Sequence, residues 1–240
     1  MRPAIGLLIF LVIAVLGLLE GRDYVRRHPQ DVPWTELSLT DPIGRFTRRK
    51  LTSLGADPGL CRSLLVKAGT RDHPVPQLRA NDQCGYVDGM RLRGGGARTL
   101  DFAPPRLITS CPVAASLLLL EQRVIQPAAQ QHFGMAVTAI DHAGSYSCRR
   151  LYGRTTGPFS EHATADAVDI VGFRLADGRR ISVLRDWSGT PSERAFLRRV
   201  RDGACDLFAT VLSPDYNEAH RDHLHLDHAR RFSSGWQLCR

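Results

Sequence analysis

The fold is organised around one ten-residue stretch, Ser160-Glu161-His162-Ala163-Thr164-Ala165-Asp166-Ala167-Val168-Asp169. The imidazole of His162 and the carboxylate of Asp169 are seven positions apart, a spacing that would align them on a helix. The residues from Val168 to Val171 are rich in β-branched side chains, however, and favour a strand. We therefore predict that His162 closes a loop and that Asp169 lies in the strand that follows it.

A second stretch, Asp222-His223-Leu224-His225, supplies two further imidazoles and another carboxylate. Leucines alternate with polar residues here, which predicts a strand over residues 222–227. In such a strand the leucines form a hydrophobic back, and the opposite face carries His223, His225 and Asp227. Asp222 falls on the leucine side of an ideal strand, so a bend at the strand start is needed to bring it to the same site.

Together the two stretches hold what a catalytic zinc site requires: three N or O ligands, an open position and a nearby acid–base group. An unpaired Asp169 would be costly inside its apolar strand, and either a metal or an arginine would satisfy it. His225 has an alternative role as a hydrogen-bonded core histidine. The neighbouring His220 and His228 flank the strand, and we expect them to be exposed or to lie behind the ligands.

Composition indicates a globular protein, because hydrophobic residues make up 43% of the chain and charged residues 23%. The formal net charge is +8, carried mostly by arginine. The basic residues are scattered in short groups such as Arg149-Arg150 and Arg179-Arg180, and no nucleic-acid-binding motif accompanies them. We expect no nucleic-acid partner; a basic surface suits an anionic membrane or cell-wall polymer.

The N-terminal residues predict export. The segment from Ala4 to Leu19 is almost unbroken apolar sequence and lacks a small-x-small cleavage signature, which favours a membrane anchor over a cleaved signal. We divide the chain into an anchor or signal (1–21), a tether (22–50) on which Trp34, Leu37 and Leu39 dock, and a domain (51–240). Six cysteines then predict up to three disulfides in an oxidising compartment, with 15 pairings open.

Periodicity predicts an α+β domain in which helices flank a small antiparallel sheet. Apolar spacing predicts helices over residues 58–68, 112–131 and 192–212, the second of them kinked or ended by Pro127. Strands are predicted over residues 135–140, 167–173, 180–184 and 222–227. The Ala176-Asp177-Gly178 turn makes the second and third strands a hairpin.

These residues resemble a known group of proteins. Ser160-x-His162-x-x-Ala165-x-Ala167-x-Asp169 and Asp222-x-x-His225 look like the two zinc motifs of the LAS metallopeptidases, which include D-alanyl-D-alanine carboxypeptidases, peptidoglycan endopeptidases and the Hedgehog signalling domain. The wider pattern over residues 30–240 is similar to the bacterial extensin-like C-terminal domain proteins. Segments that carry this similarity are Cys111-Pro112, Gly144-Ser145-Tyr146, Arg185-Asp186-Trp187 and 212–217.

The resemblance implies a single LAS/Hedgehog-like domain, stapled by disulfides, with a role for each site residue. His162, Asp169 and His225 would bind Zn²⁺, Asp222 would be the general base, and His223 would stabilise the charged intermediate. Arg149 would hold a substrate carboxylate; pairing with Asp166 or Asp169 is its alternative. The motif glycine is Ala165 here, and alanine would strain the turn if that position requires positive φ.

The function that the resemblance implies is zinc-dependent amide hydrolysis of peptidoglycan peptides on the periplasmic side of the inner membrane. The chain would then be a metallopeptidase of the carboxypeptidase or endopeptidase type. A non-catalytic peptidoglycan-binding or structural module that keeps the metal site is the alternative. A third interpretation is a disulfide-stapled scaffold without a metal.

Overall fold

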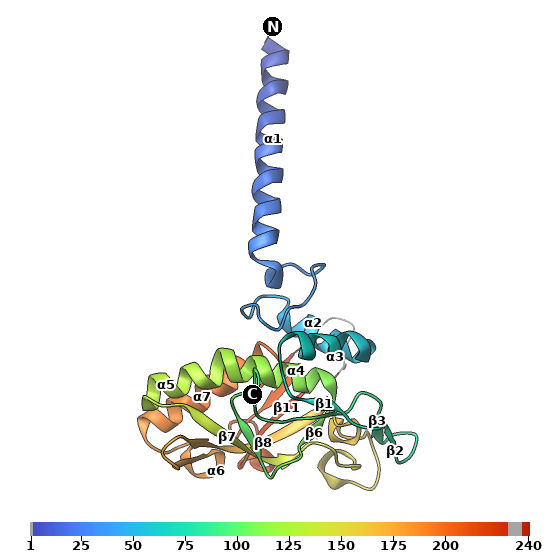
Figure 1. Ribbon diagram of the computed structural model, residues 1–240, viewed down its shortest axis with the longest axis vertical. Helices are drawn as coiled ribbons and strands as arrows, with labels where there is room; N and C mark the ends of the chain where they lie inside the picture. The colour runs from blue at the N-terminus through green and yellow to red at the C-terminus, as the bar shows by residue number, and fades with distance from the viewer. Residues whose placement is uncertain (1, 230–236) are drawn as a thin grey trace.

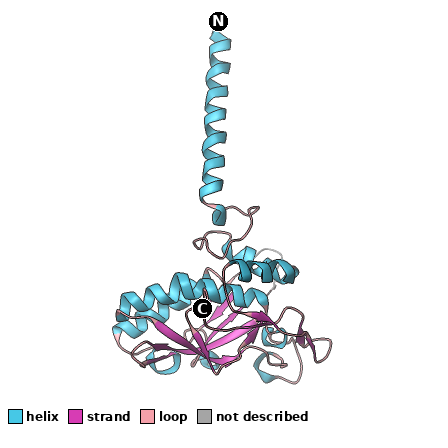
Figure 2. Ribbon diagram, viewed as in Figure 1, coloured by secondary structure: helices cyan, strands magenta, loops and turns pink. Residues whose placement is uncertain are grey.

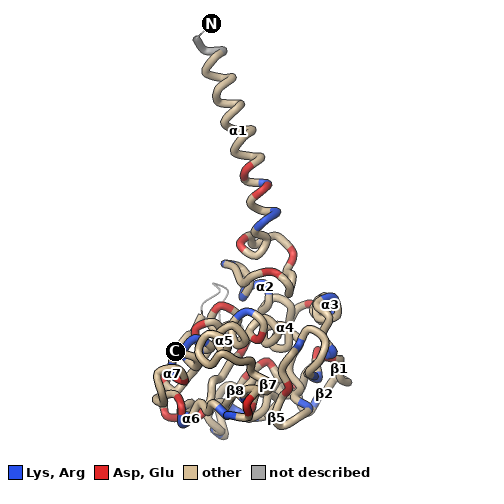
Figure 3. Tube along the Cα trace, turned by 60° about the vertical axis from the view of Figure 1, so that its left-hand side comes forward, with Lys and Arg blue, Asp and Glu red and all other residues tan. Residues whose placement is uncertain are grey.

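The structure, a computed structural model, describes residues 2–229 and 237–240 and has two parts (Figure 1). A long helix, α1 (Arg2–Arg27), projects from a domain in which helices lie over a sheet (Figures 1 and 2). Basic and acidic positions are interspersed over this domain in Figure 3. The predicted α+β class, with small sheets, flanking helices and disulfides, is confirmed.

Helix α1 is longer than the apolar segment 4–19 that predicts it. It continues through the charged residues after Leu19, because most of these are good helix formers and Asp23 pairs with Arg27 one turn later, at 2.7 Å. Residues Ile5–Arg27 are long and apolar enough to cross a membrane, and none of that apolar window is buried. An anchor and a signal sequence both have this character.

Residues 28–46 form a collar that is hydrogen-bonded to the start of the domain. A short 3-10 turn, η1 (Pro29–Asp31), follows α1, and the Lys50 ammonium donates to the Pro29 carbonyl at 2.9 Å and to the Thr35 hydroxyl at 2.8 Å. Leu39 is buried in the core, as the docking prediction requires, whereas Trp34 is 78% exposed. Leu37 is partly buried and also packs against the core. The collar is therefore attached through backbone carbonyls, Leu37 and Leu39, and the Trp34 ring does not dock.

A helical layer covers the sheet. It contains α2 (Thr47–Ser53), η2 (Leu54–Ala56), α3 (Pro58–Lys67), α4 (Cys111–Leu120), η3 (Glu121–Ile125), α5 (Gln126–Phe133) and α7 (Pro191–Cys205). Every residue of α4 is buried, and this helix lies at the centre of the core. Pro127 does not end the helix that precedes it: α4, η3 and α5 run on to Phe133. The missing N–H of Pro127 is accommodated because η3 is a π-helical turn just before it.

The main sheet has the order β12-β10-β11-β8-β7-β5, with β9 paired to β8. Its strands are β5 (Asp101–Ala103), β7 (Val137–Gly144), β8 (Ala167–Leu175), β9 (Arg180–Ser182), β10 (Thr210–Leu212), β11 (Leu224–Asp227) and β12 (Leu238–Cys239). The central pairs are antiparallel and the two outer pairs, β5 with β7 and β10 with β12, are parallel. The predicted hairpin over residues 167–184 is confirmed, with β9 followed by the short helix α6 (Val183–Asp186).

Smaller elements complete the domain. Two further sheets pair β1 (His73–Pro74), β4 (Met90–Arg91) and β6 (Ile108–Thr109), and β2 (Leu78–Arg79) with β3 (Gly85–Tyr86). Three 3-10 turns lie near the strand ends: η4 (Leu151–Gly153), η5 (Glu161–Thr164) and η6 (Glu218–His220).

The predicted helix over residues 192–212 is too long. Helix α7 begins behind a Thr190–Glu193 capping box and ends at Cys205, and residues 210–212 form β10 instead. The β-branched pair Thr210-Val211 explains the change, because it can pair with β11, where Thr210 lies opposite Asp227. Pairing with a distant strand overrides the helical spacing of the last few apolar residues.

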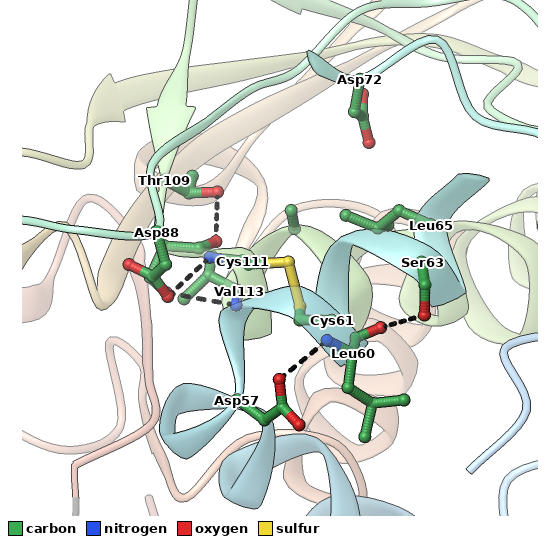
Figure 4. Close-up of a disulfide and its surroundings, with 12 residues drawn as sticks. Asp57, Leu60, Cys61, Ser63, Leu65, Asp72, Asp88, Thr109, Cys111 and Val113 are labelled. Atoms are coloured by element: carbon green, nitrogen blue, oxygen red, sulfur yellow. Dashed lines mark hydrogen bonds between the residues drawn. A yellow bond between two sulfur atoms is a disulfide. The ribbon is translucent and has the colours of Figure 1, made fainter. Parts of the chain in front are cut away.

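All six cysteines form disulfides, as an oxidising compartment predicts. The pairs are Cys61–Cys111, Cys84–Cys148 and Cys205–Cys239. Figure 4 shows the first, which joins α3 to the N-terminus of α4. Beside it, Asp57 caps α3 by accepting from the Leu60 N–H at 2.9 Å, and Asp88 accepts from the Cys111 N–H at 3.2 Å. The Cys61–Cys111 disulfide therefore fixes the N-terminal end of α4 in the helical layer that covers the sheet.

Candidate metal centre

The register of two neighbouring strands creates the centre of the site. Strands β8 and β11 are antiparallel, and their ladder places His225 directly opposite Asp169. Residues directly opposite in such a pair have their side chains on the same face. Nδ1 of His225 consequently lies 2.9 Å from Oδ1 of Asp169.

His162 reaches the same point from the turn that precedes β8. Ser160 caps the start of the turn η5, and its hydroxyl accepts from the His162 N–H at 3.3 Å. Nε2 of His162 lies 3.1 Å from Oδ2 of Asp169 and 3.2 Å from Nδ1 of His225. All three side chains are buried, and their ligand atoms lie within 4.8 Å of one another. The structure thus brings together the three residues that the sequence predicts as metal ligands.

The outer nitrogen of each imidazole has an acceptor of its own. Nδ1 of His162 lies 2.6 Å from the Ser145 carbonyl, and Nε2 of His225 lies 3.0 Å from Oδ2 of Asp227. Each acceptor calls for an N–H at that outer nitrogen, which leaves the two inner nitrogens as lone pairs in the neutral rings. A carboxylate behind a ligating histidine is the usual way in which a metal ligand is oriented.

The ionisable groups of the centre shift one another's pKa values. Burial works to raise the pKa of Asp169, but hydrogen bonds from His162 and His225 hold that pKa well below its usual value. Burial works to lower the pKa of His225, and hydrogen bonds to Asp169 and Asp227 outweigh it and raise the pKa to about 9. Asp169 and Asp227 therefore demand positive charge in this buried space; protons on the imidazoles supply it without a metal, and a divalent cation would supply it with both rings neutral. Two nitrogens and one oxygen that converge in this way fit a bound divalent cation.

His223 borders the centre, and Asp222 touches it only through His223. Nε2 of His223 lies 3.6 Å from Oδ1 of Asp169, and its Nδ1 lies 2.7 Å from Oδ1 of Asp222. The Asp222 side chain is half exposed, because residue 222 belongs to the turn before β11 rather than to the strand. The structure supplies the bend that the sequence requires, yet this bend directs Asp222 to the ring of His223.

Arg149 lies at the edge of the centre with its side chain half exposed. Its guanidinium is 3.9 Å from Oδ2 of Asp169, and Asp166 instead accepts from the Ser110 hydroxyl at 2.6 Å. Burial, together with the charges of Glu161 and Asp88, raises the pKa of Asp166 to about 8. Arg149 is thus near Asp169 and also faces the cavity.

Ala165 adopts the strained conformation that the sequence comparison anticipates. Its φ is 57° and its ψ is 16°, and its side chain is fully buried. Its carbonyl accepts from the Ser110 N–H at 2.7 Å, so the turn is fixed by a neighbouring segment. A left-handed alanine costs about 1–2 kcal/mol relative to its ordinary conformation. This turn is what separates His162 from the strand that carries Asp169.

The centre opens into a cavity of about 500 Å³. Arginines, tyrosines, leucines and imidazoles line it: Arg149, Arg150, Leu151, Tyr152, Leu212, Tyr216, His220, His223 and Leu238, beside the three ligand residues and others. His220 is one wall, and burial, with the nearby His223, lowers its pKa to about 4. His220 is therefore not exposed. It lies behind the ligand residues, which is the second of the two places expected from the sequence.

His228 is not at the surface. Its ring is buried, with Nε2 2.8 Å from the Ser116 hydroxyl and Nδ1 3.0 Å from the Thr52 hydroxyl. It therefore joins the end of β11 to α4 and α2. Asp227 lies behind His225, and no role is assigned to it from the sequence. The pattern that could have identified it is a carboxylate two positions after a histidine, because such residues lie on the same face of a strand.

The comparison with known proteins gives one family. The model of the family described as "Extensin-like protein C-terminus" matches residues 59–240, which is most of the chain. No curated protein and no solved structure matches the chain. The matched range includes all the residues of the candidate metal centre and its cavity. The chain therefore belongs to the extensin-like C-terminal family.

Proposed function

We propose that this protein is a zinc-dependent amidohydrolase related to the LAS metallopeptidases. Its substrates are the peptides of peptidoglycan, and its domain faces the periplasm with α1 as membrane anchor. One observation carries the proposal: Nε2 of His162, Nδ1 of His225 and the carboxylate of Asp169 converge, with both outer nitrogens already occupied by acceptors. Without a metal, protons on the two rings hold the buried Asp169 carboxylate; a divalent cation would take the place of the inner protons, with both rings neutral.

His162, Asp169 and His225 would hold the metal. Two imidazoles and one carboxylate are the protein ligands of many hydrolytic zinc sites, which leaves a coordination position free. When bound, zinc acts as a Lewis acid on a carbonyl oxygen and lowers the pKa of water. The Ser145 carbonyl and Asp227 orient the two rings for this role.

Proton transfer is assigned to the Asp222–His223 pair. The Nδ1–H of His223 donates to Asp222, so its Nε2 is free to accept or donate a proton on the cavity side. Asp222 acts as base through this ring, and the protonated ring also stabilises developing negative charge. Arg149 holds a substrate carboxylate at the cavity rim, since its guanidinium is half exposed and only 3.9 Å from the centre.

A specific observation favours a second candidate function. The Asp222 carboxylate is half exposed and is not among the residues that line the cavity. A non-catalytic peptidoglycan-binding module would keep the metal ligands and need no acid directed at the centre. In that case His223 and Arg149 would serve binding alone.

The experiment combines metal analysis with product analysis. We expect the purified full chain to contain one zinc per molecule, and digested sacculi to yield shortened stem peptides by mass spectrometry. His162→Ala should abolish both results, whereas His132→Ala, on the remote helix α5, should change neither. Zinc with no new peptide product from wild type, and with sacculus binding unchanged in Asp222→Asn, would favour the binding module. An unmetallated wild-type protein would contradict both functions.

A further inference from the structure

The mouth of the cavity carries two exposed aromatic rings that the proposed chemistry does not use. Tyr152 lies in η4, in the loop between β7 and β8, and Tyr216 lies between β10 and β11. Both line the cavity, and they are 59% and 39% exposed. Core packing therefore does not account for large aromatic side chains at these two positions.

The backbone of Tyr152 is strained. Its φ of 57° and ψ of 24° lie in the left-handed region, which a bulky residue rarely adopts. The side chain is mostly exposed, so burial of the ring does not offset this cost. Strained residues persist mainly where a particular side-chain position is needed for binding or catalysis.

The two rings are connected to the metal centre through His220. The Nδ1–H of His220 donates to Oδ1 of Asn217 at 2.7 Å, and the amide of Asn217 donates to the Tyr152 hydroxyl at 3.4 Å. The ring of Tyr216 packs against His220, with centroids 5.4 Å apart, and His220 is 6.0 Å from His225. The aromatic rim is thus positioned relative to the ligand residues rather than free to move with its loops.

We propose that Tyr152 and Tyr216 form a stacking platform for a sugar ring, so that the substrate is a peptide still attached to its glycan. A sugar offers a C–H face to the tyrosine rings and hydroxyls to the polar groups around them. Those groups are present: Asn217 touches the Tyr152 hydroxyl, and the Arg154 guanidinium lies 5.8 Å from the centre of its ring. This inference rests on the proposed peptidoglycan function and names the part of the polymer that the site recognises.

The test measures binding, so it does not depend on turnover. The zinc-treated full chain in detergent micelles is titrated calorimetrically with a disaccharide–tetrapeptide and with the same tetrapeptide lacking sugar. We expect the sugar to increase affinity about tenfold. Tyr152→Asn removes the ring but keeps a residue that tolerates positive φ, and it should abolish the preference. Tyr152→Phe, which keeps the ring, should retain it.

The outcomes separate the platform from the proposed reaction. Equal wild-type affinity for the two ligands, no binding of either, or a preference that survives Tyr152→Asn would overturn the platform. A sugar preference that depends on the Tyr152 ring, found together with no peptide cleavage, would support the platform while contradicting the hydrolase. Cleavage that is equally fast with and without the sugar would support the hydrolase and contradict the platform.

Discussion

Oδ2 of Asp227 lies 3.0 Å from Nε2 of His225, on the side of the ring that faces away from Asp169. Asp227 is fully buried and sits two residues further along the same strand, so strand β11 carries both the ring and the group that orients it. The tautomer of His225 is consequently determined by its own strand. This makes Asp227 the first residue to test.

Asp227→Asn should weaken zinc binding 10–100-fold, the usual effect of removing a carboxylate behind a ligating histidine. The side-chain amide of Asn can donate as well as accept, so it no longer fixes the N–H of His225 at Nε2. Nδ1 of His225 is then no longer held as the lone pair that would bind the metal. Competition with a chromogenic chelator measures the affinity. Asp82→Asn, whose side chain is 92% exposed, is the control and should bind zinc as wild type does. Equal affinities for wild type and Asp227→Asn would remove Asp227 from the site.

Ala165→Gly should leave stability within about 1 kcal/mol of wild type, because relief of the left-handed strain and loss of a buried methyl group nearly cancel. Ala165→Val places a β-branched side chain at φ 57° in a fully buried turn. It should destabilise the protein by more than about 3 kcal/mol and weaken zinc binding, because the turn sets His162. Urea unfolding and chelator competition measure the two effects. A valine variant as stable as wild type would contradict this account of the turn.

Asp166→Asn should become more stable relative to wild type as the pH rises. Burial raises the Asp166 pKa to about 8 in the folded chain, whereas an unfolded aspartate ionises near 4. Between these values the folded state binds a proton that the unfolded state has lost, so wild-type stability falls as pH increases from 4 to 8. The difference between variant and wild type should shift by about 3–4 kcal/mol from pH 5 to pH 8 in urea unfolding. The Ser110 hydroxyl can donate to Asp166 or to the asparagine that replaces it, so this hydrogen bond is kept in the variant. A stability difference between variant and wild type that does not change with pH would contradict the raised pKa of Asp166.

Arg98→Met should destabilise the domain by about 3–5 kcal/mol, because it leaves two buried acids without their partner. The Arg98 guanidinium lies 2.7 Å from Oδ2 of Asp72 and 3.5 Å from Oε2 of Glu121, and all three side chains are buried. Thermal and urea unfolding measure the loss. Arg199→Met, at an exposed position of α7, should stay within about 0.5 kcal/mol of wild type. Similar losses in both variants would mean that the buried network contributes nothing specific.

The sequence predicts the parts of the site that depend on local pattern. Strand alternation predicts β8 and β11, and the histidine-bearing turn before β8 follows from the break between Ser160 and Val168. The end of α7 is missed because β10 is formed by pairing with β11, a partner outside the local window. The disulfide partners could not be predicted either, since the two halves of each pair are 34 to 64 residues apart and meet only in the folded domain.

The burial of His228 and the direction of Asp222 could not be predicted for the same reason. His228 is enclosed by Ser116 and Thr52, which lie in helices far away in the sequence. Asp222 leaves the strand face because residue 222 is in a turn whose geometry depends on the preceding η6. Pattern identifies which side chains are chemically suited to a site, and long-range packing decides which of them reach it.

The collar between α1 and the domain limits how α1 could act as a membrane anchor. Lys50 donates to the carbonyl of Pro29, two residues after the end of the helix, so only a very short length of chain separates α1 from the folded body. With α1 in a bilayer, the domain stands at a set height above the lipid surface and cannot sweep through a large volume. If the protein acts on peptidoglycan as proposed, access to more wall polymer would come from lateral diffusion of the whole protein in the membrane plane, and the cavity would act on one thin layer of the wall.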